Sequence, residues 1–421
     1  MPNRDTGATR VTHCTRFLRP LATLSIAGCM LAVACGADWT QFRGPNSNSA
    51  TRGQAPPLDW SDAENENIAW KVELPGRGPA SPIVVGDRVI VTCSSGVKQD
   101  RLHVLCFEAD SGERLWERQF WATGRTLSHP SSANAAPTPA SDGELIFAFF
   151  SSNDLACLDL DGNLRWFRGL AHDFPQAGND VGMSSSPVVI GDTLVAQVEN
   201  QGDSFATGID KNTGQTRWRV PRPRKSCWTS PVVMRGQGGE DLVLLQSPTK
   251  LTAHDPETGE EVWAYETECD SISSPAAVDG SVYVASKGIT ALEPTGSRQP
   301  EVEWNAQNLQ PGAASVVVAD DQLFIINRAG VLSCAGTKDG KVQWRVRLDG
   351  EFWGTPALVG DRLYCVSQKG SAQVVDVGEG DQSGKIIGRG QFDGAIQASP
   401  AAVDGALYVR SDGHLWKVAT P

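Results

Sequence analysis

The sequence predicts an all-β fold: an eight-bladed β-propeller built from four-stranded antiparallel blades. Two landmarks recur along the chain and predict it. One is a small residue plus Pro that opens an apolar strand, and the other is a Trp that returns every 40 to 52 residues. Composition agrees, because 43 Gly and 25 Pro among 421 residues favour many turns and few long helices.

Eight strand openings follow one another. Seven contain Pro, and Ala314-Ser315-Val316 has the same phase without it. The openings with Pro are Ser81-Pro82, Thr138-Pro139, Ser186-Pro187, Ser230-Pro231, Ser274-Pro275, Thr355-Pro356 and Ser399-Pro400. The count predicts eight blades, with seven as the alternative if the Ala314 unit is not a blade.

Each unit has the length of four short strands joined by hairpin turns, clearest between Ser274 and Trp304. The two ends of the array are incomplete in complementary ways. Trp70 lies in a last strand without an opening of its own, and the unit opened at Ser399 stops at Val418 without a Trp strand. Joined, they make one blade, which predicts a ring closed by the N-terminal strand with no exposed sheet edge.

A motif precedes most of the recurring Trp residues: Ala253-x-Asp255-x-x-Thr258-Gly259-x-x-x-Trp263, echoed by Asp210, Thr213-Gly214 and Trp218. It resembles the tryptophan-docking motif of the pyrroloquinoline quinone (PQQ) repeat propellers, which include the BamB-like propellers, over nearly all of residues 68–418. The resemblance implies that each Trp packs between neighbouring blades. The residues concerned are Trp70, Trp116, Trp166, Trp218, Trp263, Trp304 and Trp344.

Small residues recur six positions before the turn Gly of this motif, namely Cys106, Gly208, Ala253 and Cys334, with Cys157 after one deletion. A site that accepts Gly, Ala or Cys is a small buried slot, so these cysteines are interpreted as core residues. A disulfide between Cys93 and Cys106 is the alternative.

Residues 1–37 are predicted to be a secretion signal, because four arginines precede an apolar run from Leu21 to Ala34. A lipoprotein signal around Ile26-Ala27-Gly28-Cys29 is the alternative, with a lipid anchor. Residues 38–67 form an N-terminal extension and residues 68–421 the propeller. A periplasmic or other extracytoplasmic monomer is expected. No later stretch reaches the ~18 apolar residues of a membrane span, and a net charge of −12 argues against a nucleic-acid partner.

A four-stranded meander sends alternate connections to opposite rims. The connections between strands one and two and between three and four are short turns, such as Gly86-Asp87. The other rim receives the long segments 120–136 and 169–184, the stretch 199–203, and the basic stretch that ends at Lys225. Long loops on a rigid scaffold are where binding usually occurs, so this loop-rich rim is the predicted binding face.

Candidate ligand-binding residues follow from this placement. Trp228 and Trp353 each stand three residues before an opening Pro, where either could stack on a ligand or plug the channel. Arg222, Arg224 and Lys225 could bind a carboxylate or sulfate, or be a solvated basic strand. His129 and His172 are the two histidines that lie in the long loops.

Oxygen-bearing side chains in the same loops are candidate ligands of a hard cation such as Ca²⁺. They are Asn179, Asp180, Glu199, Asn200 and Asp203. The alternative is that they cap turns through Asx hydrogen bonds. Searches for G-x-S-x-G, H-E-x-x-H, P-loop and G-x-G-x-x-G motifs find nothing, so no catalytic residue is assigned.

The leading hypothesis is an exported, non-enzymatic scaffold that needs no cofactor and binds a protein or small ligand at its loop-rich rim. The rival, implied by the resemblance, is a dehydrogenase that uses PQQ and Ca²⁺, although the chain has no adjacent Cys-Cys pair and is short for that class. A glycan-binding propeller ranks third, on its Trp-bearing loops alone.

Overall fold

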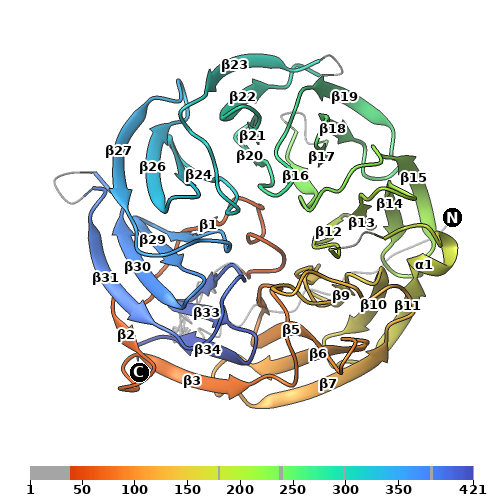
Figure 1. Cartoon of the computed structure of the whole chain (residues 1–421), viewed down its shortest axis with the longest axis horizontal. Coiled ribbons are helices and arrows are strands. Elements are labelled where there is room, and N and C mark those ends of the chain that lie inside the picture. The colour runs from red at the N-terminus through yellow and green to blue at the C-terminus, as the bar shows by residue number, and fades with distance from the viewer. Residues whose placement is uncertain (1–37, 179–180, 237–239, 297–298, 380–382, 421) are drawn as a thin grey trace, which may run out of the picture. The chain divides into compact units, whose positions relative to one another are not determined.

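A computed structural model describes residues 38–178, 181–236, 240–296, 299–379 and 383–420. Regular structure in these ranges is almost entirely β, with one short helix, α1 (Leu170–Asp173). The strands form seven four-stranded antiparallel sheets and one six-stranded sheet, set around a common centre (Figure 1).

Six of the four-stranded sheets contain consecutive strands, and the two middle strands of each are buried along most of their length. The first three are β4 (Ile83–Val85), β5 (Arg88–Ser95), β6 (Arg101–Glu108) and β7 (Arg114–Trp121); β8 (Ala140–Ser141), β9 (Leu145–Phe149), β10 (Asp154–Asp159) and β11 (Leu164–Gly169); β12 (Val188–Ile190), β13 (Thr193–Val198), β14 (Phe205–Asp210) and β15 (Thr216–Pro221). The next three are β16 (Val232–Met234), β17 (Leu242–Ser247), β18 (Lys250–His254) and β19 (Glu261–Glu266); β20 (Ala276–Val278), β21 (Ser281–Ala285), β22 (Ile289–Glu293) and β23 (Glu301–Ala306); β24 (Val317–Ala319), β25 (Gln322–Ile326), β26 (Val331–Gly336) and β27 (Val342–Arg347).

The seventh four-stranded sheet joins the two ends of the array. It contains β3 (Ile68–Glu73), β34 (His414–Val418), β33 (Ala406–Arg410) and β32 (Ala401–Val403), in that order. Strand β3 pairs antiparallel with β34, and Val72 lies opposite Leu415. The Trp70 strand thus supplies the strand that the last unit lacks.

The remaining sheet differs from the predicted four strands. Its core is β28 (Ala357–Val359), β29 (Arg362–Val366), β30 (Ser371–Asp376) and β31 (Ile386–Gln391), flanked by β1 (Ala50–Thr51) and β2 (Trp60–Ser61) as parallel edge strands. Seven sheets therefore match the predicted four-stranded blade, and the prediction of eight such blades is not supported. Seven is the number of blades that the sequence analysis gave as the alternative. The N-terminal extension, predicted only as a separate segment, contributes both additional strands.

A missing Trp explains why this sheet accepts β2. Gly388 lies opposite Val374, in the register that Trp344 has opposite Cys334 in the preceding sheet. A Cβ at Gly388 would lie 2.2 Å from the Leu58 carbonyl oxygen, and one at Gly390 would lie 2.0 Å from the Trp60 ring. Two glycines thus leave the room that the extension and its buried Trp60 fill.

The docking Trp residues pack between adjacent sheets. The Trp116 ring lies against Gly162 and the Trp218 ring against Gly259, both left-handed glycines where a Cβ would lie 2.6 Å from the ring. The Trp218 indole N–H donates to the Pro256 carbonyl at 2.8 Å. Equivalent ring contacts are Trp70 with Gly112, Trp166 with Gly214, Trp304 with Gly340 and Trp344 with Gly384. Trp263 is buried, and the loop after β22 contains residues outside the described ranges.

The small residues of the predicted slot lie directly opposite these Trp side chains. Cys106 pairs with Trp116 and Cys334 with Trp344 across their strands. All seven cysteines after residue 37 are free and buried. The alternative disulfide is wrong, because Cys93 lies opposite His103 and Cys106 opposite Ile90.

Eight hydrogen bonds connect the innermost strands in a circle. In each, the backbone N–H of the residue that precedes the opening Pro, or of Ser315 in the unit without Pro, donates to the side-chain hydroxyl of its counterpart in the next sheet. The distances are 2.9 to 3.0 Å, and the last bond, from Ser399 to Ser81, returns the series to its start. We call Ser81, Thr138, Ser186, Ser230, Ser274, Ser315, Thr355 and Ser399 the hydroxyl ring.

The N-terminal extension crosses the centre of the sheets below this ring (red at the middle of Figure 1). Trp39 pairs with Val84, the Thr40 carbonyl accepts from Ser141, and Ala50 pairs with Leu358. Each contacted residue lies three positions after a ring residue, so residues 39–50 run from one side of the centre to the other at that level. We call residues 39–50 the plug.

We expect Trp218→Ala to lower the free energy of unfolding by about 3–5 kcal/mol, because it opens a cavity between two sheets. Urea unfolding followed by circular dichroism measures this. Trp353→Ala is the control, since Trp353 is 44% exposed, and it should change stability by less than about 0.5 kcal/mol. Equal losses in both variants would contradict the docking role of Trp218.

Candidate functional site

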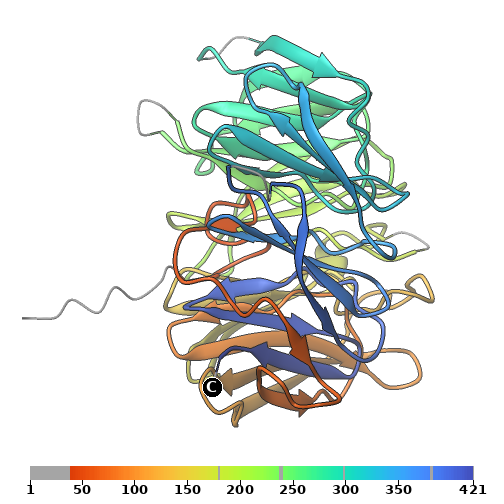
Figure 2. The same ribbon diagram turned by 90° about the vertical axis from the view of Figure 1, so that its left-hand side faces the viewer.

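The long loops meet on one rim. The His129 N–H donates to the Val181 carbonyl at 3.1 Å, and the Asp203 N–H donates to the Gln176 carbonyl at 3.2 Å. Gln201 reaches the basic stretch through a 2.7 Å hydrogen bond to the Ser226 hydroxyl. The segments near residues 129, 176, 201 and 226 are therefore contiguous. Figure 2 shows the sheets from the side.

A cavity of about 500 Å³ occupies the centre of the molecule. Its wall contains all eight residues of the hydroxyl ring, and Phe42 of the plug also lines it. Apolar side chains make up much of the remainder, including Met183, Ile272 and Trp228. The cavity therefore combines a polar girdle with an apolar lining, which is typical of small-ligand pockets.

Three of the predicted ligand-binding residues line this cavity: His129, Trp228 and Trp353. The Trp228 indole N–H donates to the Gly182 carbonyl at 2.9 Å, which fixes the ring against the long loop before β12. Trp353 is 44% exposed, and His129 is exposed with its Nδ1 2.7 Å from the Ser131 hydroxyl. The structure thus brings together one side chain from each of three distant segments.

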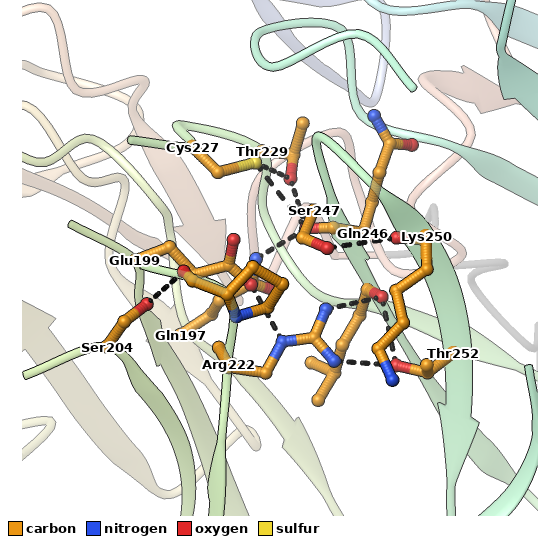
Figure 3. Close-up of polar contacts among 12 residues, drawn as sticks. Gln197, Glu199, Ser204, Arg222, Cys227, Thr229, Gln246, Ser247, Lys250 and Thr252 are labelled. Carbon is orange, nitrogen blue, oxygen red and sulfur yellow. Dashed lines mark hydrogen bonds and ion pairs between the residues drawn. The ribbon is translucent and has the colours of Figure 1, made fainter. Parts of the chain in front are cut away.

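The basic residues are divided. Arg224 and Lys225 are exposed on the rim, outside the cavity lining. Arg222 is buried, and its guanidinium donates to the Glu199 carboxylate at 2.7 Å, the Thr252 hydroxyl at 2.8 Å and the Leu245 carbonyl at 3.0 Å (Figure 3). The donors of Arg222 are therefore used inside the protein, and Arg222 is not among the residues that line the cavity.

The candidate cation ligands have internal roles where the structure describes them. Glu199 is paired with Arg222, and the Asn200 amide accepts from the Gly202 N–H at 2.6 Å and donates to the Asp203 carbonyl at 2.8 Å. This is the Asx turn that the alternative named. Asn179 and Asp180 lie outside the described residues. Within the described part of the chain, no three His, Cys, Asp or Glu side chains gather as a metal site.

His172 lies on α1 and is exposed, outside the cavity lining. A different histidine, His103, joins two polar side chains. His103 Nε2 lies 2.7 Å from the Ser95 hydroxyl and its Nδ1 lies 2.8 Å from Glu117. His103 is buried, and a Cβ at Gly76 would come within 3.1 Å of the Ser95 Cβ. The contacts with Ser95 and Glu117 therefore provide hydrogen-bond partners for a buried imidazole, which does not line the cavity.

Sequence reasoning missed two contributors to the cavity. In the sequence, the residues of the hydroxyl ring were recognised only as the start of each repeat. The Ser or Thr that recurs before each opening Pro is a signal that could have predicted a ring of hydroxyl groups. Phe42 and Arg43 of the plug occur once in the chain and outside the repeat. Nothing in the periodicity could have indicated that they reach the centre.

We expect the stability of the protein to fall as pH rises through about 7 because of Glu199. Burial raises the pKa of this carboxyl to about 7, even though Arg222 lowers it, and its Oε2 has no hydrogen-bond partner among the described residues. The native state thus binds a proton that the unfolded state, with a pKa near 4.5, has released. The stabilisation from this proton is complete below the pKa that Glu199 has in the unfolded protein, and it is lost above the pKa that Glu199 has in the folded protein.

Glu199→Gln provides the matched comparison, because the amide does not titrate. Urea midpoints of both proteins between about pH 5 and about pH 8 should diverge, with the unmodified protein losing more stability as pH rises. Parallel profiles would contradict this assignment.

Comparison with known proteins agrees with this architecture. The family described as outer membrane protein assembly factor BamB matches residues 44–207, 202–291 and 285–383, which together span most of the chain. The outer membrane protein assembly factor BamB of Alkalilimnicola ehrlichii is 27% identical over 49% of this chain, a match that spans 48% of that relative. A polyvinylalcohol dehydrogenase of a Pseudomonas species is 22% identical over 72% of this chain and 57% of that relative.

Among solved structures, BamB from Moraxella catarrhalis superposes with a TM-score of 0.62 at 17% identity, covering 84% of this chain and 97% of that chain. This likeness concerns the fold. Given the span of the family match, the chain belongs to the family of PQQ-like propellers described as outer membrane protein assembly factor BamB.

Proposed function

We propose that this protein is an exported, non-enzymatic scaffold that binds a protein partner of outer-membrane protein assembly through its loop-rich rim. The single observation that carries the proposal is the meeting of three long segments, near residues 129, 176 and 201, on one rim of a rigid propeller. Rigid elements that present irregular loops are the usual arrangement for binding. The match to the BamB family supports a protein as the partner.

We also infer that the six-stranded sheet is an eighth blade, so that the propeller has eight blades closed through β3. The hydroxyl ring supports this, because Thr355 of that sheet takes its place between Ser315 and Ser399. A gap at this position would break the circle of hydrogen bonds. Strands β1 and β2 then cover the two edges of the blade without pairing to another chain.

An extracytoplasmic location is part of the same proposal. It rests on the predicted signal in residues 1–37 and on the similarity to relatives named outer membrane protein assembly factor BamB. In the ranges that the structure describes, no helix combines the length and apolarity needed to cross a membrane.

Exposed apolar side chains on the loop-rich rim are the proposed contact points. Val97 lies in the connection from β5 to β6, Trp121 ends β7, and Leu127 and Val181 lie in the long loops. Their exposed fractions range from 39% to full exposure. Apolar side chains that gather on one face are typical of interaction sites, whereas single ones are ordinary.

A photo-crosslinking amino acid at Leu127 or Val181, in the full chain expressed in its own cell envelope, should give a specific adduct with an outer-membrane assembly protein. Leu164 and Val302 are the matched controls, since they are 50% exposed on β11 and β23. The control positions should give no such adduct. Equal crosslinking at all four positions, or adducts only with unrelated proteins, would exclude the rim as the binding face.

The dehydrogenase remains the second candidate because of the relative named polyvinylalcohol dehydrogenase. The described residues do not fit its cation. Glu199 is the buried carboxylate of the candidate set, and it already pairs with the Arg222 guanidinium at 2.7 Å. A calcium ion beside it would meet a positive charge.

Incubation of the purified protein with PQQ and Ca²⁺ should therefore give no bound quinone absorbance after gel filtration, and no dye-linked alcohol oxidation. The physical reason is the occupied Glu199 carboxylate. Retained quinone absorbance together with alcohol oxidation would overturn the scaffold proposal in favour of the enzyme.

A further inference from the structure

The hydroxyl ring has eight oxygen atoms that accept hydrogen bonds but donate none to the described residues. Each oxygen receives one backbone N–H from the preceding sheet. Among the described residues, none of these hydroxyls donates a hydrogen bond to a protein atom. Each hydroxyl group can donate one hydrogen bond. The cavity is therefore lined by eight hydroxyl donors that a ligand could engage.

A buried positive charge lies next to this ring. Arg43 of the plug is 1% exposed. Its guanidinium donates to the Pro275 carbonyl at 2.7 Å and to the Val316 carbonyl at 2.6 Å. These acceptors directly follow ring residues Ser274 and Ser315 in the sequence, so the charge lies one residue below the ring.

No carboxylate neutralises Arg43 among the described residues, and its Nε has no hydrogen-bond partner there. Burial lowers the pKa of Arg43 to about 9, which still leaves it charged at neutral pH. An unpaired buried charge is costly unless something offsets it. The protein as a whole has a net charge of −12, so an isolated cation at its centre is a local exception.

We propose that the central cavity binds a small carboxylate with an apolar body, its carboxylate within the hydroxyl ring and its apolar part against Trp228 and Ile272. The ring supplies donors, and Arg43, which is not among the lining residues, supplies a buried positive charge one residue from the ring. Hydroxyl donors together with a nearby buried cation recognise oxyanions. The apolar lining above the ring selects an acid with a hydrophobic group over a bare inorganic anion.

The ring needs its hydroxyl groups, whichever residue supplies them. Ser occupies six positions and Thr the other two, Thr138 and Thr355. Both residues offer the same donor and acceptor, whereas Ala offers neither. This gives a conservative substitution that the fold already tolerates at equivalent positions.

Benzoate is the probe for this site, with benzamide as its neutral isostere and benzylamine as its cationic counterpart. Isothermal titration calorimetry with the full chain should show saturable binding of one benzoate per protein, at least about tenfold tighter than benzamide. Benzylamine should not bind. Equal affinity for benzoate and benzamide, or no saturable benzoate binding at millimolar concentration, would overturn the proposal.

Variants assign the binding to the ring. The double variant Ser274→Ala/Ser315→Ala should bind benzoate at least about tenfold more weakly, whereas Ser274→Thr/Ser315→Thr should stay within about threefold of the unmodified protein. Unchanged affinity in the Ala variant would place benzoate elsewhere and overturn the proposal. Circular dichroism and thermal unfolding check that each variant is folded.

Arg43→Met tests the charge, and Arg43→Lys should restore part of the affinity. The control is Arg389→Met, which removes an exposed guanidinium paired with Asp349 and should leave benzoate affinity unchanged. If Arg43→Met fails to fold, the ring variants still decide the outcome. Val181 lines the cavity but Leu127 does not, so the crosslinking result at Leu127 tests the scaffold proposal independently of benzoate binding.

Discussion

The circle of hydrogen bonds between innermost strands is the constraint on which the rest of this molecule depends. Each sheet contributes one backbone donor and one hydroxyl acceptor, and the series returns from Ser399 to Ser81. This fixes where every innermost strand begins. It thereby sets which connections reach the loop-rich rim, which residues line the central cavity, and where the plug can pass.

Adjacent sheets are held at their outer edges by a different interaction. The docking Trp of one sheet covers a left-handed glycine of the next, and five indole N–H groups donate to carbonyls across the boundary. Where the Trp is absent, at Gly388, the N-terminal extension fills the space with Leu58, and its Trp60 packs on Gly390. One sheet thus lacks the docking Trp of the repeat, and residues of the N-terminal extension take its place.

What could be predicted from the sequence follows the same division. The repeat reveals strand order, the small residues opposite each Trp, and the rim on which the loops lie, because these recur. The environment of Arg222 could not be predicted because its partner Glu199 lies 23 positions earlier, directly after β13. A contact between such distant segments leaves no mark on local composition. Arg43, Phe42 and the edge strands β1 and β2 belong to a segment that occurs once, so periodicity could not place them.

The pairing of β3 with β34 also governs how the chain can be made. Residues near 70 find their partners only near 415, so the seventh sheet has to wait until synthesis of the chain is almost finished. Contacts so distant in sequence form slowly. Until that strand has been made, β3 lacks its only partner in the sheet, so this part of the molecule can fold only after translation has nearly ended.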